Sequence, residues 1–143
     1  MSSARQLLLR LNAMFLLVAA AGGLATDLAG AFFATGPQAI LLARAPHAAI
    51  GFVEAHGLAL ILGVLLWRAL PARASHFTAA TVHVLLGTAN LVFWQFFDDT
   101  GMLLTGYVTT MLHWGFVGLQ LFAALTFEKP RFAKLTARDT QVV

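Results

Sequence analysis

The residues that could do chemistry here are histidines and a few carboxylates, because the chain has five histidines and no cysteine. The stretch HAAIGFVEAH, from His47 to His56, puts two of the histidines and Glu54 in an otherwise apolar region. His83 and His113 lie in two further apolar regions. Ionisable groups are expensive in apolar surroundings and tend to mark functional sites. These side chains are therefore the first candidates for a site.

The composition predicts an integral membrane protein. Of the 143 residues, 59% are hydrophobic and 10% are charged, and the mean hydropathy is +0.81; an average soluble domain has about one quarter charged residues. The basic residues lie at the ends of apolar segments and not in a patch with interleaved aromatics, which argues against nucleic-acid binding. We find no phosphate loop, nucleophile elbow or HExxH motif, so nucleotide-binding and hydrolase functions lose their usual support.

Four apolar segments are long enough to cross a membrane, which takes about 20 helical residues. They cover residues 7–33, 46–70, 75–97 and 102–127. The first connection can include a short interfacial piece, and the next two are short, which predicts antiparallel neighbours. The predicted fold is therefore all-α: one integral membrane four-helix bundle over residues 1–143, with residues 128–143 as a polar cytoplasmic tail.

The basic residues also predict an orientation. One side of the membrane receives Arg5, Arg10, Arg68, Arg73, Lys129, Arg131, Lys134 and Arg138, and the other receives Arg44 with Asp98 and Asp99. The positive-inside rule then places both termini in the cytoplasm, in what we expect to be a bacterial inner membrane. Asp27, near the outer end of the first span, is expected to reach the headgroups or to pair with Arg44.

Depth separates the histidines into two groups. His56, His83 and His113 lie about 15, 21 and 17 Å from the outer ends of their spans, at about 1.5 Å per helical residue. All three are near the midplane of a hydrocarbon core about 30 Å thick. His47 and His76 fall near the interfaces, where an imidazole can reach water, and are predicted to be structural.

Rotation around the helices adds a second pattern, because residues seven apart share nearly one face. Such polar stripes are His76, His83 and Asn90 with Gly87 in the third span, Gly106, His113 and Gln120 with Thr109 in the fourth, and Asn12, Ala19 and Thr26 in the first. Polar atoms are costly against lipid, so the stripes are predicted to face one another inside the bundle.

The second span presents two polar faces. Glu54 and His56 are two residues apart, which is about 200° around a helix. Both cannot belong to one compact site, so one of them points into the bundle and the other toward lipid, a groove or another subunit. The sequence leaves open which one.

The leading functional hypothesis is a haem b for electron transfer, because transmembrane bundles offer facing histidines and glycine-lined space. His83 and His113 are the predicted axial ligands, and His56 is able to replace either. Gly87 and Gly106 would leave room for the ring. Hydrogen bonds to its periphery would come from Asn90, Thr109 or Gln120. Electrons would pass to or from a quinone or a partner subunit.

Three alternatives stay open. His56, His83 and His113 could instead hold a transition metal as three imidazole ligands. Glu54 with a histidine could form a site for a hydrophobic ligand or an isomerase-type substrate, with no metal. In size and span count the chain is similar to sterol isomerases and the related EXPERA ligand-binding proteins; the similarity is architectural and implies no residue roles. Finally, the polar groups could only join helices in a homo-oligomer or an accessory or pigment-binding subunit of a larger complex.

Overall fold

The structure, a computed structural model, describes residues 2–126 and is helical throughout. Its helices are α1 (Ser2–Phe33), α2 (Ala39–Arg44), α3 (Ala48–Arg68), α4 (Arg73–Val92), α5 (Gln95–Asp99) and α6 (Leu103–Leu125). Residues 2–126 contain no strand, so the predicted all-α class is confirmed. The short piece expected in the first connection is α2. The predicted tail, residues 128–143, lies outside the described residues.

Three helices have the length and hydropathy needed to cross a membrane: α1 from Ala4 to Phe33, α3 and α6. Their outward faces carry large exposed apolar side chains, among them Val18, Ile50, Leu58 and Met111. So many exposed large apolar side chains are unsuited to water and suit lipid. A helical membrane protein is therefore plausible from the structure as well as from the composition.

The predicted third span, 75–97, is divided in the structure. α4 ends at Val92, the backbone leaves the helical conformation at Phe93, and α5 resumes for five residues from Gln95. Phe97 of α5 folds back onto α6, where the ring lies 2.7 Å from the position that a Cβ atom on Gly106 would occupy. Within the described part of the chain α4 falls outside the three apolar candidates, because much of its length is polar.

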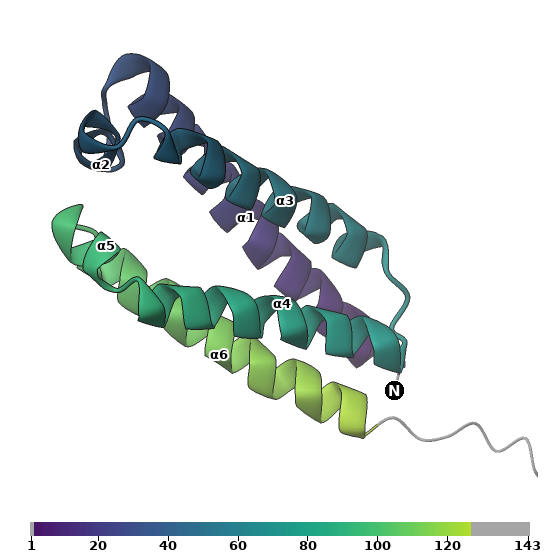
Figure 1. Ribbon diagram of the computed structural model, residues 1–143. Coiled ribbons are helices and arrows are strands. Elements are labelled where there is room, and N and C mark those ends of the chain that lie inside the picture. Colours follow the sequence, from purple (N-terminus) through teal and green to yellow (C-terminus); the bar gives the residue numbers. More distant parts are fainter. Residues whose placement is uncertain (1, 127–143) are drawn as a thin grey trace, which may run out of the picture.

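The long helices lie in two pairs, α1 along α3 and α4 along α6 (Figure 1). Glycines lie at close contacts within each pair. A Cβ atom on Gly63 of α3 would lie 2.9 Å from the Leu17 side chain of α1, and one on Gly87 of α4 would lie 3.2 Å from Cβ of His113 in α6. Close approach at small residues is how membrane helices gain packing contacts.

The two pairs join mainly in the half that contains the start of α1. There Leu9, Ala13 and Leu16 of α1 form a buried core cluster with Leu66 of α3 and Ala79 of α4. At that end Arg5 Nη2 donates a hydrogen bond of 2.7 Å to the carbonyl oxygen of Thr126.

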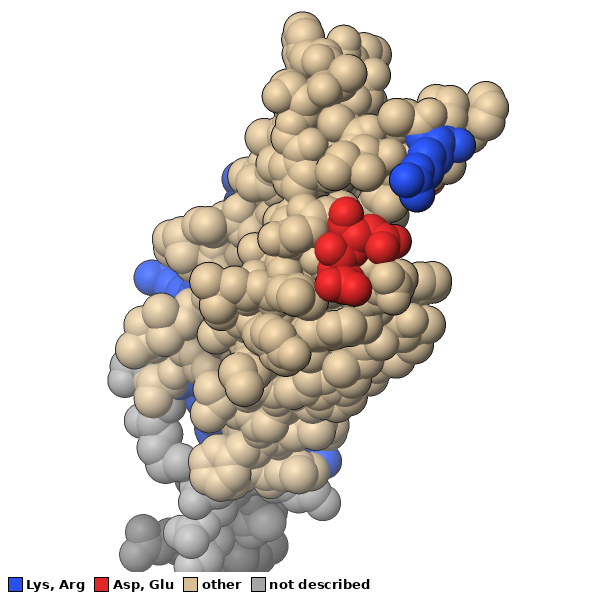
Figure 2. Space-filling model, turned by 90° about the vertical axis from the view of Figure 1, so that its left-hand side faces the viewer, with Lys and Arg blue, Asp and Glu red and all other residues tan. Residues whose placement is uncertain are grey.

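The opposite end carries α2 and α5 (Figure 1). Asp98 and Asp99 are exposed on α5, and Figure 2 shows an acidic patch with a basic side chain beside it on this face.

Candidate functional site

Polar side chains join α4 to α6 at three levels. His76 Nδ1 donates to Gln120 Oε1 at 2.6 Å, His83 Nδ1 lies 2.8 Å from His113 Nδ1, and Asn90 Nδ2 donates to Thr109 Oγ1 at 3.2 Å. These are the two stripes read from the sequence, paired level by level. The prediction that the stripes of the third and fourth spans face one another is confirmed.

The level at the start of α4 includes α1. Gln120 Nε2 donates to Asn12 Oδ1 at 2.9 Å, so one amide links three helices. His76, Gln120 and Asn12 are all fully buried. His76 therefore does not reach water as expected, because α1 covers the face of α4 on which it lies, but its contact is a structural one, as predicted.

The middle level brings together the two histidines predicted as axial ligands. His83 and His113 are buried, and one Nδ1 must donate a proton to the other. The rings of Phe15 and Phe116 lie against them, with centroids 5.0 Å apart for His83 and Phe116 and 5.3 Å apart for Phe15 and His113. In this arrangement no ring fits between the two imidazoles.

The other residues assigned to the haem pocket make helix contacts. A Cβ atom on Gly87 would lie 3.0 Å from Trp114 Nε1, and Gly106 packs against Phe97, so both glycines are covered by neighbouring side chains. Asn90 also donates to Thr110 at 3.2 Å. Among the residues assigned to the haem pocket, His83 has a buried Nε2 with no hydrogen-bond partner among the described residues.

A second polar cluster, formed by residues of α1, α3 and the turn into α2, centres on Asp27, for which the sequence analysis expected other partners. Asp27 is fully buried, and its Oδ2 lies 2.5 Å from His56 Nδ1. Gln38 Nε2 donates to Asp27 Oδ1 at 3.2 Å and to Thr26 Oγ1 at 2.8 Å. Asp27 is thus held from both sides, and neither the headgroups nor Arg44 supply its partners.

The Asp27–His56 contact fixes the tautomer of the imidazole. An ionised carboxylate only accepts hydrogen bonds, so Nδ1 of His56 carries the proton that is shared with Asp27, and Nε2 is the nitrogen left for any other contact. The His56 ring packs on α1 at Gly23, where an added Cβ atom would lie 2.2 Å from Nε2. The His56 side chain keeps 33% of its surface exposed while Asp27 has none, so the pair is reached through the imidazole.

The structure settles which face of the second span meets the bundle. His56 points toward α1, whereas Glu54 is exposed on the far side of α3. His56 is engaged with Asp27 and not with His83 and His113. Within residues 2–126 no three His, Asp or Glu side chains are grouped so that they could hold a metal ion.

A sequence signal for Asp27 exists in the spacing of α1. The buried residues Leu9, Ala13, Leu16, Ala20 and Asp27 follow the alternating three- and four-residue steps of a helix face turned toward a partner, with Gly23 completing the series. Asp27 continues that face, so the pattern places it inside. Its closeness to the end of the span suggested the opposite.

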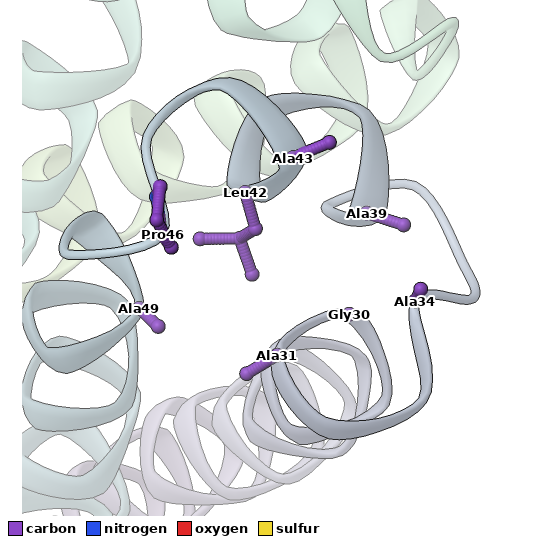
Figure 3. Close-up of a pocket in the computed structure, with 8 residues that line it drawn as sticks. All are labelled: Gly30, Ala31, Ala34, Ala39, Leu42, Ala43, Pro46 and Ala49. Atoms are coloured by element: carbon purple, nitrogen blue, oxygen red, sulfur yellow. The ribbon is translucent and has the colours of Figure 1, made fainter.

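A small, half-open pocket lies between the end of α1, α2 and the start of α3 (Figure 3). Its volume is about 200 Å³, and it is lined by Gly30, Ala31, Ala34, Ala39, Leu42, Ala43, Pro46 and Ala49. Gly30 follows Asp27 by three residues, and Ala49 precedes His56 by seven, so the cavity lies along the same seam as the Asp27–His56 pair.

Comparisons of the chain with protein-family models, with curated proteins and with solved structures find no match.

Proposed function

We propose that this protein is a four-helix membrane bundle with antiparallel neighbours and cytoplasmic termini, and that its Asp27–His56 pair performs acid–base chemistry on a hydrophobic substrate. The observation that carries the proposal is the 2.5 Å contact between a fully buried carboxylate and a partly exposed imidazole in apolar surroundings. An ionisable pair in a membrane span is costly to keep unless it has a use.

The roles of the two side chains follow from their contacts. Asp27 is a positioning residue: it accepts the Nδ1 proton and holds the ring on Gly23. His56 Nε2 is the group that meets the substrate, as a base that accepts a proton and then returns it as an acid. Asp27 stabilises the imidazolium formed between these two steps, which is the division of roles found in His–Asp catalytic pairs.

A proton shift along an unsaturated chain suits such a pair. In a β,γ-unsaturated ketone, Nε2 removes a proton from the carbon between the carbonyl and the double bond, and the electrons of that C–H bond move into the dienolate. The same proton is then delivered to the γ carbon, which yields the conjugated α,β-unsaturated isomer. Atoms and electrons balance with no oxidant, metal or second substrate. A hydrophobic ketone can reach His56 from the bilayer.

The test uses a straight-chain β,γ-unsaturated methyl ketone in proteoliposomes and follows the ultraviolet absorption of the conjugated product. We expect His56→Phe to lower the rate by about 10²- to 10⁴-fold, the usual contribution of a general base. His47→Phe is the matched control, because His47 is exposed at the start of the same helix and should keep the full rate. Equal rates for wild type and His56→Phe would reject the proposal. Loss of activity in Glu54→Gln with Asp27→Asn unaffected would transfer the role to Glu54.

Haem b bound near His83 stays a hypothesis for the same bundle, favoured by the buried Nε2 of His83 that lacks a partner. With Nδ1 held by His113, Nε2 is the atom that would bind iron, and His113 would orient the ligand as a neighbouring hydrogen-bond partner commonly does. When bound, haem would supply one-electron chemistry. Phe15 and Phe116 would have to give way to the ring.

An absorption spectrum of the purified protein, oxidised and then reduced with dithionite, tests the haem hypothesis. A Soret band that is lost in His83→Ala and kept in His47→Ala would support it. Absence of haem bands in wild-type protein purified from haem-supplemented cells would reject it. If both this test and the isomerisation test fail, the polar contacts serve assembly, as expected of an accessory or pigment-binding subunit.

A further inference from the structure

Glu54 lies on the side of α3 that faces away from the rest of the protein. It precedes Gly63 by nine residues, which is about two and a half turns of helix, so the two residues lie on opposite sides of α3. Gly63 faces α1, because a Cβ atom added to it would lie 2.9 Å from the Leu17 side chain. Among the described residues none forms a hydrogen bond or an ion pair with Glu54. The helices of one chain therefore leave this carboxyl group without a partner.

The surroundings of Glu54 are apolar. Ile50, Leu58 and Ile61 lie on the same side of α3 and are all exposed. Glu54 comes six residues after Ala48, where α3 begins, which is about 9 Å along the axis. α3 is also one of the helices that are long and apolar enough to cross a membrane. Ionisable groups in such helices are expensive, and they almost always face a protein interior or pair with one another. A partner from outside the chain is therefore expected.

The chemistry of a carboxyl group favours a second copy of this chain as that partner. Copies in one membrane share one orientation, so two α3 helices packed side by side run parallel, and the two Glu54 residues meet at the same depth. A protonated carboxyl donates a hydrogen bond and an ionised one accepts it, so the two groups satisfy each other with one shared proton. A lysine or arginine of a different protein would itself have to be placed in lipid.

The residues around Glu54 have the spacing of a parallel helix pair. Five exposed residues follow one another at alternating steps of three and four: Gly51, Glu54, Leu58, Ile61 and Leu65. These steps are those of the a and d positions at which two parallel helices interlock. Gly51 has nothing within 4 Å of an added Cβ atom, so the two backbones can approach closely one turn away from the carboxyl groups.

We infer that the protein forms a homodimer through this face of α3, held by a hydrogen bond between the Glu54 carboxyl groups of the two copies. The interface is separate from the Asp27–His56 pair, because His56 packs on α1 on the other side of the helix. Loss of the dimer therefore leaves the isomerisation of a ketone at His56 in place, and loss of His56 leaves the dimer in place.

Cysteine crosslinking in cell membranes tests the face. The chain has no cysteine, so Ile61→Cys gives one thiol per copy, seven residues after Glu54 and on the same face. We expect copper phenanthroline to produce a disulfide-linked species of twice the 15.3 kDa chain mass. Ala55→Cys is the matched control, because it is exposed on the same helix but about 100° away from Glu54, and it should stay monomeric.

Three outcomes of the crosslinking would overturn the inference. Ile61→Cys could give no crosslinked product, or the two variants could give equal amounts of dimer, which would indicate random collision. The third is a product whose mass differs from twice that of the chain, which would assign the face to a different protein.

Substitutions of Glu54 test the hydrogen bond itself. Energy transfer between copies labelled at the N-terminus, in proteoliposomes of increasing lipid content, measures the dimer dissociation constant. We expect Glu54→Ala to weaken the dimer about tenfold, the effect of one hydrogen bond between membrane helices. Glu54→Gln keeps a donor and an acceptor and should stay close to the wild type. An unchanged dissociation constant in Glu54→Ala would overturn the inference, since this exposed side chain makes no contact that folding of one chain needs.

Discussion

At the scale of single residues, the environment of each ionisable group follows from the helix face on which it lies. His56 and Glu54 are two residues apart, yet His56 packs on Gly23 and bonds to buried Asp27, whereas Glu54 is exposed. Gly23 makes this arrangement possible, since its missing side chain is the space that the imidazole fills. The neighbouring Gly22 has nothing within 4 Å of an added Cβ atom and has no such role.

These two glycines give a prediction about stability. Gly23→Ala places a methyl group where the His56 ring lies, and we expect it to lower the free energy of unfolding by about 1–3 kcal/mol, as overpacking does. Gly22→Ala should be neutral or stabilising by up to about 1 kcal/mol, because alanine is the better helix former. Reversible unfolding in mixed micelles, followed by circular dichroism, measures both variants.

A double-mutant cycle identifies the cause of the expected loss. In a His56→Ala background the cost of Gly23→Ala should largely disappear, because the group that it displaces is gone. An equal cost in both backgrounds would contradict the packing of His56 on Gly23.

Some of the site contacts could be predicted from the pattern within a single helix, and others could not. The meeting of His83 with His113 followed from depth and from seven-residue spacing, both of which a single helix carries. The choice between His56 and Glu54 needed the neighbouring helix, because α3 is apolar on nearly every side and its own pattern favours neither face. Gln38 gave no signal, since a glutamine in a connection is ordinary.

At the scale of the helices, α4 is the helix whose ability to lie in a membrane depends most on the helices packed against it. Its polar side chains lower its hydropathy, yet His76 and His83 are fully buried against α6 and α1. Alone, this helix would expose those groups to lipid. Paired with α6, it presents mainly apolar side chains outward, and its 20 residues span about 30 Å.

We therefore predict that α4 crosses the membrane. Because the chain has no cysteine, Ala72→Cys and Asp99→Cys each give a single thiol, one before α4 and one after it. In intact cells a membrane-impermeant maleimide should label only the Asp99→Cys variant, and the Ala72→Cys variant should react only after permeabilisation. Labelling of both thiols from the same side would contradict the crossing.

At the scale of the whole molecule, two helix pairs are joined along part of their length. The core cluster of Leu9, Leu16, Leu66 and Ala79 and the Asn12–Gln120 bond connect the pairs in one half of the molecule. The Asp27 cluster lies near the other end, within the pair formed by α1 and α3. The all-α class was readable from composition, but this pairing was not, because connection lengths specify which helices are neighbours and not how closely each pair approaches the other.

The sequence distances within the two polar clusters also bear on how the chain enters the bilayer during synthesis. The partners of Asp27 are Gln38 and His56, 11 and 29 residues later, so its hydrogen-bond partners are present as soon as the first hairpin has left the ribosome. The partner of Asn12, by contrast, is Gln120, which is synthesised 108 residues later and lies near the end of α6. The first hairpin can therefore reside in lipid with its acid already hydrogen-bonded, while the contact that joins it to the second hairpin forms only when translation is nearly complete.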